Sequence, residues 1–119
     1  MTDRNQYRVT LSLPWIVRGV EHAQDAINIS VSEVGKRVSA ADTEHVSRSK
    51  IGVQTLCSED TDTPIQAVLI VAETALVGLT LDCRVLASSP KDAEAAVLRE
   101  LGPEFEGIPL VPVESVRQE

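Results

Sequence analysis

The sequence is poor in aromatic residues and cysteine, and each shortage excludes a class of protein. Only one Tyr, one Trp and one Phe occur among 119 residues, although 43% of the chain is hydrophobic. The core must therefore be built from Val, Leu, Ile and Ala, and base stacking on a row of aromatic side chains is not available. Two cysteines, Cys57 and Cys83, are too few for a disulfide scaffold, so we expect free thiols and a cytoplasmic location.

Positive charge is the next shortage. Eighteen acidic residues outnumber eleven basic ones, which leaves a net charge of −7, and eight of the basic residues are Arg. An acidic chain offers no general surface for phosphate backbones, so we expect no nucleic-acid partner.

The chain also lacks a hydrophobic run long enough to span a membrane. The apolar stretch 65–81 is interrupted by Gln66, Glu73 and Thr74, and a span needs about 20 apolar residues. The N-terminal residues MTDRNQYR lead straight into a predicted strand, without the apolar segment of a signal peptide. We expect no membrane association and one domain over residues 1–119, with residues 1–5 flexible.

The clearest pattern that is present lies in residues 73–87, ETALVGLTLDCRVLA. Apolar side chains at the odd positions 77–85 alternate with Thr80, Asp82 and Arg84, which is the period of a strand with one buried face. We expect this strand to be the centre of a sheet. Residues 7–13 alternate in the same way, and Pro14 predicts that this first strand ends or reaches a sheet edge there.

Three further segments complete the predicted sheet. Residues 45–56 form a weaker strand candidate, and residues 57–64 an acidic, turn-rich loop. The apolar run 65–72 fits a helix or a strand; its β-branched content favours extended structure with a bend near Glu73 and Thr74. Whether this run is a separate strand or the start of one long bent strand stays open. Residues 108–116 predict a last strand, which Pro109 and Pro112 place at an edge.

Two segments have the helical period instead. In residues 22–38, Ile27, Val31, Val34 and Val38 fall on one stripe. A second helix is predicted to begin after a capping Ser89, with Pro90 at its first position, and to end at Gly102-Pro103. The order of elements predicts an α+β, ferredoxin-like βαββαβ fold: a four- to five-stranded antiparallel sheet with two helices on one face.

Three runs of sequence together resemble a known family. They are PWIVRGVEHAQDAINISVSEVGKRV (14–38), ETALVGL (73–79) and IPLVPVESV (108–116). The chain is similar over most of its length to small archaeal proteins grouped as domain-of-unknown-function family 555. The resemblance implies an archaeal, cytoplasmic protein without an established biochemical role.

The chain departs from that family at one point. Many members carry a Cys-x-x-Cys-Gly element between the second strand and the TALVG strand, whereas here Cys57 is followed three residues later by Asp60. Because a two-cysteine knuckle is half of a tetrahedral zinc site, one thiol leaves the site degenerate. We therefore expect no zinc and no other cofactor, and Cys57 would bind a metal only if a dimer mate or partner completed the site.

Other catalytic and metal-binding chemistry finds little support. Cys57, Cys83, His22 and His45 are not at metal-ligand spacing. The simpler interpretation is two surface histidines and two thiols that are buried or lie in a loop. The sequence contains no Gly-x-Ser-x-Gly elbow or evident Cys–His pair. The acidic loop lacks the EF-hand pattern. These observations favour a protein that is not an enzyme.

The face of the predicted sheet that no helix covers suggests a partner. Arg8, Asp82 and Arg84 would lie there together, and Arg8 and Arg84 could contact Asp82 of a second copy across a two-fold axis. The leading hypothesis is thus a non-enzymatic homodimer that also binds a protein partner, and Arg84→Glu should weaken self-association.

A second hypothesis is a small-molecule sensor with its site near Trp15, Arg18 and Thr74. It depends on the concentration of family-like residues in 14–18 and 73–78, and a ligand there should change the fluorescence of Trp15. A Trp15 that closes the end of the core is the simpler alternative. The weakest hypothesis is a metal-binding role retained from Cys-x-x-Cys relatives.

Overall fold

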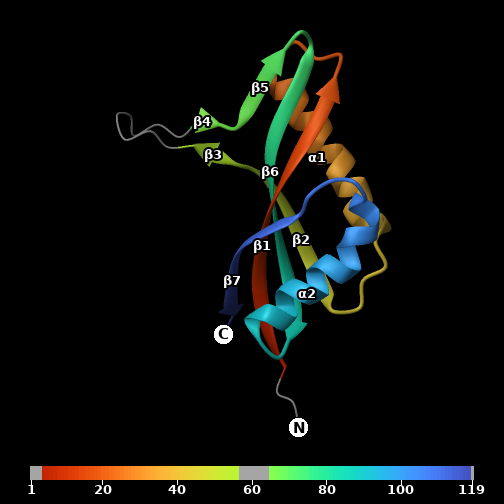
Figure 1. Ribbon diagram of the computed structural model, residues 1–119, viewed down its shortest axis with the longest axis vertical. Coiled ribbons are helices and arrows are strands. Elements are labelled where there is room, and N and C mark those ends of the chain that lie inside the picture. The colour runs from red at the N-terminus through yellow and green to blue at the C-terminus, as the bar shows by residue number, and fades with distance from the viewer. Residues whose placement is uncertain (1–3, 57–64, 119) are drawn as a thin grey trace.

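Two long strands form the centre of the molecule. The computed structural model describes residues 4–56 and 65–118. Strands β1 (Asn5–Arg18) and β6 (Thr74–Ala87) pair antiparallel over their whole length (Figure 1). β7 (Val111–Gln118) pairs with the outer edge of β1, and β2 (Val46–Val53) with the outer edge of β6. The order across the sheet is β2-β6-β1-β7, and all neighbours are antiparallel.

A second short strand shares the outer edge of β6. β2 pairs with the half of β6 that ends near Val85, and β5 (Val68–Val71) pairs with the half that begins at Thr74. Between them the chain leaves the sheet as a hairpin, β3 (Thr55–Leu56) with β4 (Ile65–Gln66). The N–H of Gln54 donates to the Gly78 carbonyl, and the N–H of Gly78 donates to the Ala67 carbonyl. The junction therefore stays hydrogen-bonded to β6 although the hairpin projects away (Figure 1).

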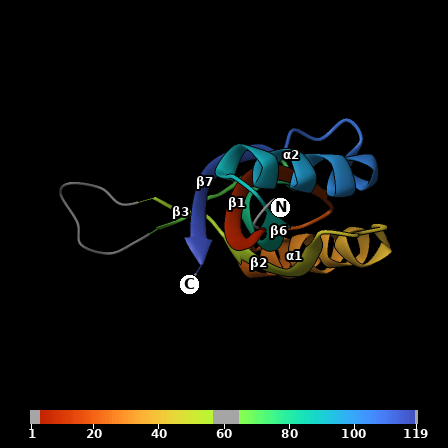
Figure 2. The ribbon, with the colours of Figure 1, turned by 90° about the horizontal axis from the view of Figure 1, so that it is seen from below.

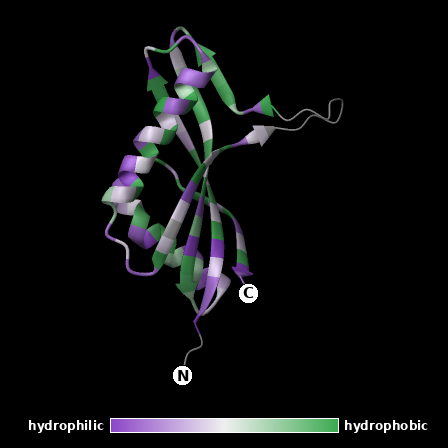
Figure 3. Ribbon diagram, turned by 180° about the vertical axis from the view of Figure 1, so that it is seen from behind, coloured by the Kyte–Doolittle hydropathy of each residue, from purple (hydrophilic) through white to green (hydrophobic). Residues whose placement is uncertain are grey.

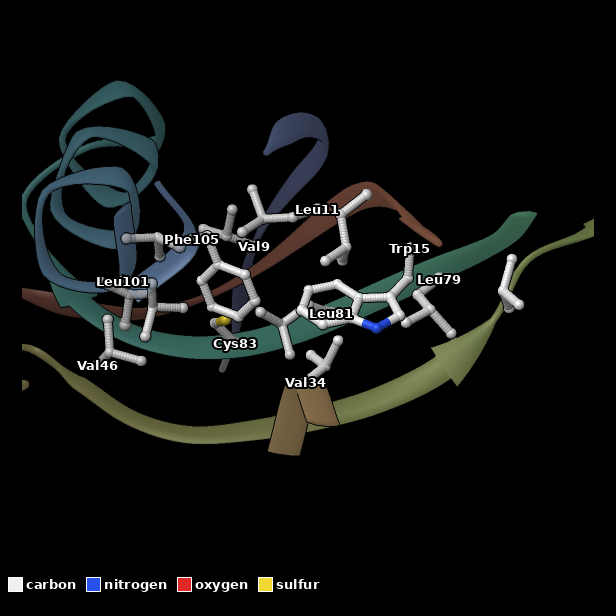
Figure 4. Packing of buried hydrophobic residues seen from close by; sticks show 14 of the residues in the cluster. Val9, Leu11, Trp15, Val34, Val46, Leu79, Leu81, Cys83, Leu101 and Phe105 are labelled. Atoms are coloured by element: carbon white, nitrogen blue, oxygen red, sulfur yellow. The ribbon is translucent and has the colours of Figure 1, made fainter. Parts of the chain in front are cut away.

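Two helices cover one face of this sheet. Helix α1 (Ala23–Ala40) and helix α2 (Pro90–Leu101), with the 3₁₀ turn η1 (Gly102–Phe105), lie on the side of the strands opposite to the hairpin (Figure 2). The odd-numbered side chains of β1 and β6 point toward the helices and are buried along both strands. Figure 4 shows this core, which contains Leu11, Leu79 and Leu81 of the strands together with Val34 of α1 and Leu101 of α2.

The predicted α+β class, the central strand and both helices are confirmed. β6 has strands on both sides, as the alternation in residues 73–87 predicted. Helix α1 extends two residues beyond the predicted end at Val38. Ser89 caps α2 by accepting a hydrogen bond from the N–H of Asp92, and Pro90 begins the helix. After Leu101 the chain tightens into η1 at Gly102-Pro103.

Of the two alternatives predicted for Pro14, the sheet edge is confirmed and the strand end is wrong: β1 continues to Arg18, but its pairing with β7 stops at Ser12. The Gly78 N–H and carbonyl both bond away from β1, so Pro14 and Gly78 face each other as a non-hydrogen-bonded pair. The Pro14 nitrogen therefore points to the outer edge, beyond Ser12, where the pairing with β7 ends. A proline at that position therefore removes no hydrogen bond from the sheet.

One other strand boundary differs from the prediction. The last strand begins at Val111 rather than Ile108 and continues to Gln118; it does lie at a sheet edge. The run 65–72 is extended, as expected, and the open question of its identity is answered: it forms the separate strands β4 and β5, divided from β6 by a two-residue turn at Ala72 and Glu73. Both turn residues have positive φ, 49° and 65°, as a tight hairpin of matching twist requires. The predicted acidic loop 57–64 and residues 1–3 lie outside the described residues.

Candidate functional site

The face of the sheet opposite the helices is the candidate functional surface, and we call it the open face. It carries no helix among the residues that the structure describes, and it displays the even-numbered side chains of β1 and β6. The strand register arranges these side chains in rows across the sheet. The rows divide into two chemically different halves.

The charged half lies toward the start of β1. It consists of Arg8 and Thr10 on β1, Asp82 and Arg84 on β6, Lys50 on β2 and Glu114 on β7. Thr10 Oγ1 donates to Asp82 Oδ1 at 2.6 Å, and Arg8 Nη2 lies 4.0 Å from Glu114 Oε1. Arg8, Ser49, Lys50, Asp82 and Arg84 line a depression of about 440 Å³. The structure thus brings together Arg8, Asp82 and Arg84, as the sequence predicted.

The apolar half lies toward the β5–β6 turn and was not expected. Here Ile16, Leu76 and Leu69 form one row across β1, β6 and β5. Val71 lies in the next row toward the turn, and Pro14 lies in the next row away from it. Exposure of these large side chains is high: 62% for Ile16, 62% for Leu69, 64% for Val71 and 45% for Leu76. In Figure 3 the β5 ribbon is hydrophobic in colour along its length. The open face is therefore not polar throughout.

A groove separates the apolar half from the projecting hairpin. It has a volume of about 520 Å³, and its lining includes Pro14, Ile65, Leu69 and Leu76. Gly78 gives it depth, because a Cβ at that position would lie only 2.7 Å from Gln54 Oε1. The Gln54 side chain crosses the sheet there and donates to the Ser12 hydroxyl. Gln54 and Ser12 thus mark the boundary between the apolar half and the charged half.

Trp15 is placed on the covered face, not on the open face. Its side chain is buried, its ring meets Phe105 edge-to-face at 6.5 Å between centroids, and the Arg37 guanidinium lies 5.0 Å above it (Figure 4). Arg37 also donates to the Glu104 carbonyl. This arrangement fixes α1, η1 and β1 to one another, so the geometry gives Trp15 a packing role.

Arg18 and Thr74 lie opposite each other at the far end of the β1–β6 pair. Both are exposed and belong to the open face by their position in the register. Since Trp15 points to the other face, the structure does not assemble these three residues into one cleft. A sensor site at this end of the sheet stays a prediction without a geometric basis in these contacts.

His45 forms the most strongly hydrogen-bonded polar cluster, with Glu100 of α2. Glu100 Oε1 accepts from the N–H groups of Glu44, His45 and Val46, and Oε2 lies 3.0 Å from His45 Nδ1. Burial alone would raise the pKa of Glu100, but these donors hold the pKa below its usual range. Because one carboxylate satisfies three backbone donors at the start of β2, we assign the pair a structural role.

Cys83 is a buried free thiol. Cys83 lies on the covered face, accepts a weak hydrogen bond from Ser49 Oγ at 3.6 Å, and burial raises the pKa of its thiol to about 11. A thiol held protonated in this way is a poor nucleophile and a poor metal ligand. Cys57 and Asp60 fall outside the described ranges. Within residues 4–56 and 65–118, no three His, Cys, Asp or Glu side chains gather to hold a metal ion.

The surface residues that sequence reasoning missed are Lys50 and the apolar row of Ile16, Leu69 and Leu76. Lys50 stood in a strand whose partner was unknown, and Ile16 lay beyond the predicted end of its strand. One signal was available for Leu76: it has the same parity as Thr80, Asp82 and Arg84, so it belongs to their face. The same residue counting could have found Ile16 had β1 been continued through Pro14.

Over the described residues, the fold and surface define an α+β domain whose antiparallel sheet has helices on one side and none on the other. This chain belongs to the family described as "Protein of unknown function (DUF555)", which matches residues 7–118. A UPF0212 protein of Methanocaldococcus jannaschii is 37% identical over 114 residues, which cover 95% of this chain and 96% of the relative. UPF0212 proteins of Methanococcus vannielii and Halorubrum lacusprofundi are each 35% identical, covering 92% and 94% of this chain and 96% and 89% of their own.

The predicted resemblance to this archaeal family is therefore confirmed. No solved structure matches the chain. In the part of the chain that the structure describes, neither helix is long and apolar enough to cross a membrane.

Proposed function

We propose that this protein is a non-enzymatic interaction module that pairs with a second copy of itself through the apolar half of the open face. The observation that carries the proposal is the cross-strand row Ile16–Leu76–Leu69, which leaves three large apolar side chains exposed side by side. Single exposed apolar residues are ordinary on protein surfaces, but contiguous patches commonly mark interaction sites.

A second copy is the partner that best fits this patch. The apolar half has no charged residue in the rows of Pro14 and Ile16, so its complement must itself be apolar. An identical patch meets that need, and two-fold pairing lets each copy bury the same surface. The groove beside the hairpin could receive an apolar side chain from the opposite protomer.

The test is the mass of the protein in solution as a function of concentration. We expect the unmodified chain to be a dimer by light scattering and Leu76→Glu to be a monomer, because a buried unpaired carboxylate is costly. Leu98→Glu is the matched control, since Leu98 is an exposed leucine on α2, away from the open face. Circular dichroism establishes that both variants remain folded.

Several outcomes would contradict the proposal. An unmodified chain that remains monomeric at every concentration would do so, as would dissociation by Leu98→Glu alone. The sequence suggested instead that Arg84 contacts Asp82 of the second copy. A stronger effect of Arg84→Glu than of Leu76→Glu would move the interface to the charged half.

The finer fold assignment is part of the same proposal. The order β2-β6-β1-β7 with two helices on one face supports a ferredoxin-like domain, in which β2 and β5 together serve as the second strand. An experimental structure would contradict this if β2 paired elsewhere. We place the protein in the cytoplasm on its two-cysteine composition, which cell fractionation would test.

A further inference from the structure

The charged half of the open face concentrates positive charge on an acidic protein. The depression of about 440 Å³ has three cationic residues in its lining, Arg8, Lys50 and Arg84, against a single acid, Asp82. The whole chain carries a net charge of −7. A local excess of two positive charges is therefore opposite in sign to the protein around it.

The strand register makes this arrangement unfavourable in the free protein. Arg8 on β1 lies directly opposite Arg84 on β6. Like charges directly opposite one another destabilise a sheet. Glu114 relieves little of this repulsion, because its 4.0 Å pair with Arg8 is about half exposed to solvent. An anion between the arginines would relieve it.

We propose that this depression binds a small phosphate monoester that carries a hydroxyl group near its phosphate. A phosphate monoester has close to two negative charges at neutral pH, which matches the local excess of positive charge. Guanidinium groups recognise phosphate oxygens through paired N–H donors, so Arg8 and Arg84 bind the phosphate, and Lys50 adds a third cation.

Asp82 supplies the second half of the recognition. Thr10 donates to its Oδ1 and so holds the carboxylate in the depression next to the cations. Inorganic phosphate has only its own P–O–H group to donate to this carboxylate, and that contact places the two anions against each other. A hydroxyl group on the ligand donates to Asp82, so the site favours a hydroxylated ester over inorganic phosphate.

The site is independent of the proposed dimer contact. Ser12 and Gln54 separate it from the apolar half, and binding is measured by a different observable from self-association. Leu76→Glu, which should abolish the dimer, is expected to leave ligand binding unchanged.

The experiment is a titration of the ¹⁵N-labelled full chain with glycerol 3-phosphate and, separately, with inorganic phosphate. We expect the amide signals of Arg8, Lys50, Asp82 and Arg84 to shift, with tighter binding of the ester. Arg8→Gln and Arg84→Gln should each weaken binding of both ligands about tenfold. Arg117→Gln is the matched control, because Arg117 bonds Asn5 outside the depression.

Asp82→Asn distinguishes recognition from simple charge attraction. The variant should bind inorganic phosphate at least as well as the unmodified chain and lose its preference for the ester. Shifts spread over the whole surface, or shifts that persist in Arg8→Gln and Arg84→Gln, would overturn the proposal. An oligonucleotide that shifts these signals when neither phosphate ligand does would overturn it as well, in favour of a nucleic-acid surface.

Discussion

The covered and open faces of β1 and β6 are made by the same two strands, yet they have opposite relations to the rest of the chain. On the covered face, residues from Tyr7 to Val17 and from Ala75 to Ala87 are buried at every second position. On the open face, charged and apolar side chains remain exposed in separate halves. The covered face is completed by α1 and α2, whereas no helix among the described residues covers the open face.

The comparison shows why apolar side chains on the two faces have different meanings. Leu81 and Leu76 belong to the same strand, but Leu81 is fully buried under the helices and Leu76 is 45% exposed. Burial of the first stabilises the fold, whereas exposure of the second leaves apolar surface in contact with water.

Truncation of the two leucines should change the free energy of unfolding by very different amounts. Leu81→Ala should lower the free energy of unfolding by about 2–5 kcal/mol, because it removes buried methyl groups and leaves a cavity. Leu76→Ala should change it by about 0.5 kcal/mol or less in the monomer. Urea denaturation at a protein concentration below self-association measures both values. Equal losses would mean that the open face is covered within a single chain.

The two faces should also differ in the rate at which a thiol on them reacts. In a Cys57→Ser background, Cys83 should react with a disulfide reagent at pH 8 about 100-fold more slowly than an unhindered thiol, since its pKa lies near 11 instead of 9.0. The matched variant moves the thiol one residue, by Cys83→Ser with Arg84→Cys, and should react freely. Equal rates in the native protein would contradict the assignment of the two faces; denaturant should abolish the difference.

Two glutamates, Glu100 and Glu114, should also differ in how much they contribute to stability. Glu100→Gln should destabilise the protein by about 1–3 kcal/mol at neutral pH, because a charged acceptor of three N–H groups is lost. Glu114→Gln on the open face should have little effect, since its pair with Arg8 is long and exposed.

The pH dependence of the Glu100 effect follows from the direction of its pKa shift. Because the folded state lowers the pKa of Glu100, its stabilising contribution is complete above the ordinary value of 4.5 and is lost as the pH falls through the folded value. The gap between the unmodified chain and Glu100→Gln should therefore close in acid. A gap that stays constant between pH 7 and pH 3 would contradict the role given to this carboxylate.

Much of the fold could be predicted from local patterns. The alternation in residues 73–87 predicted the central strand, and the helical stripe from Ile27 to Val38 predicted α1. The cap at Ser89 was also correct, because its side chain bonds a backbone group only three residues away. The same parity argument placed Arg8, Asp82 and Arg84 on one face, where the structure puts them.

The features that prediction missed depend on contacts between distant segments. A bend near Glu73 was expected, but not a tight turn at Ala72 and Glu73 in which the Glu73 carbonyl accepts N–H bonds from Gly19 and Val20. A sheet edge at Pro14 was expected too, but not that β1 continues beyond it, because the pairing at Gly78 directs the proline nitrogen toward the outer edge. The sequence predicted a surface position for His45, whereas in the structure Glu100 of α2 lies beside it.

By itself, the sequence determined which face of each long strand is buried and where both helices begin, because periodicity and capping act over a few residues. Its composition makes the chain acidic, and its resemblance to other chains placed it in an archaeal family. Only the tertiary structure decided that Ile16, Leu69 and Leu76 form one exposed row and that Lys50 joins Arg8 and Arg84. Such neighbours come from the pairing of strands far apart in the chain, and strand pairing is fixed by the whole sheet together.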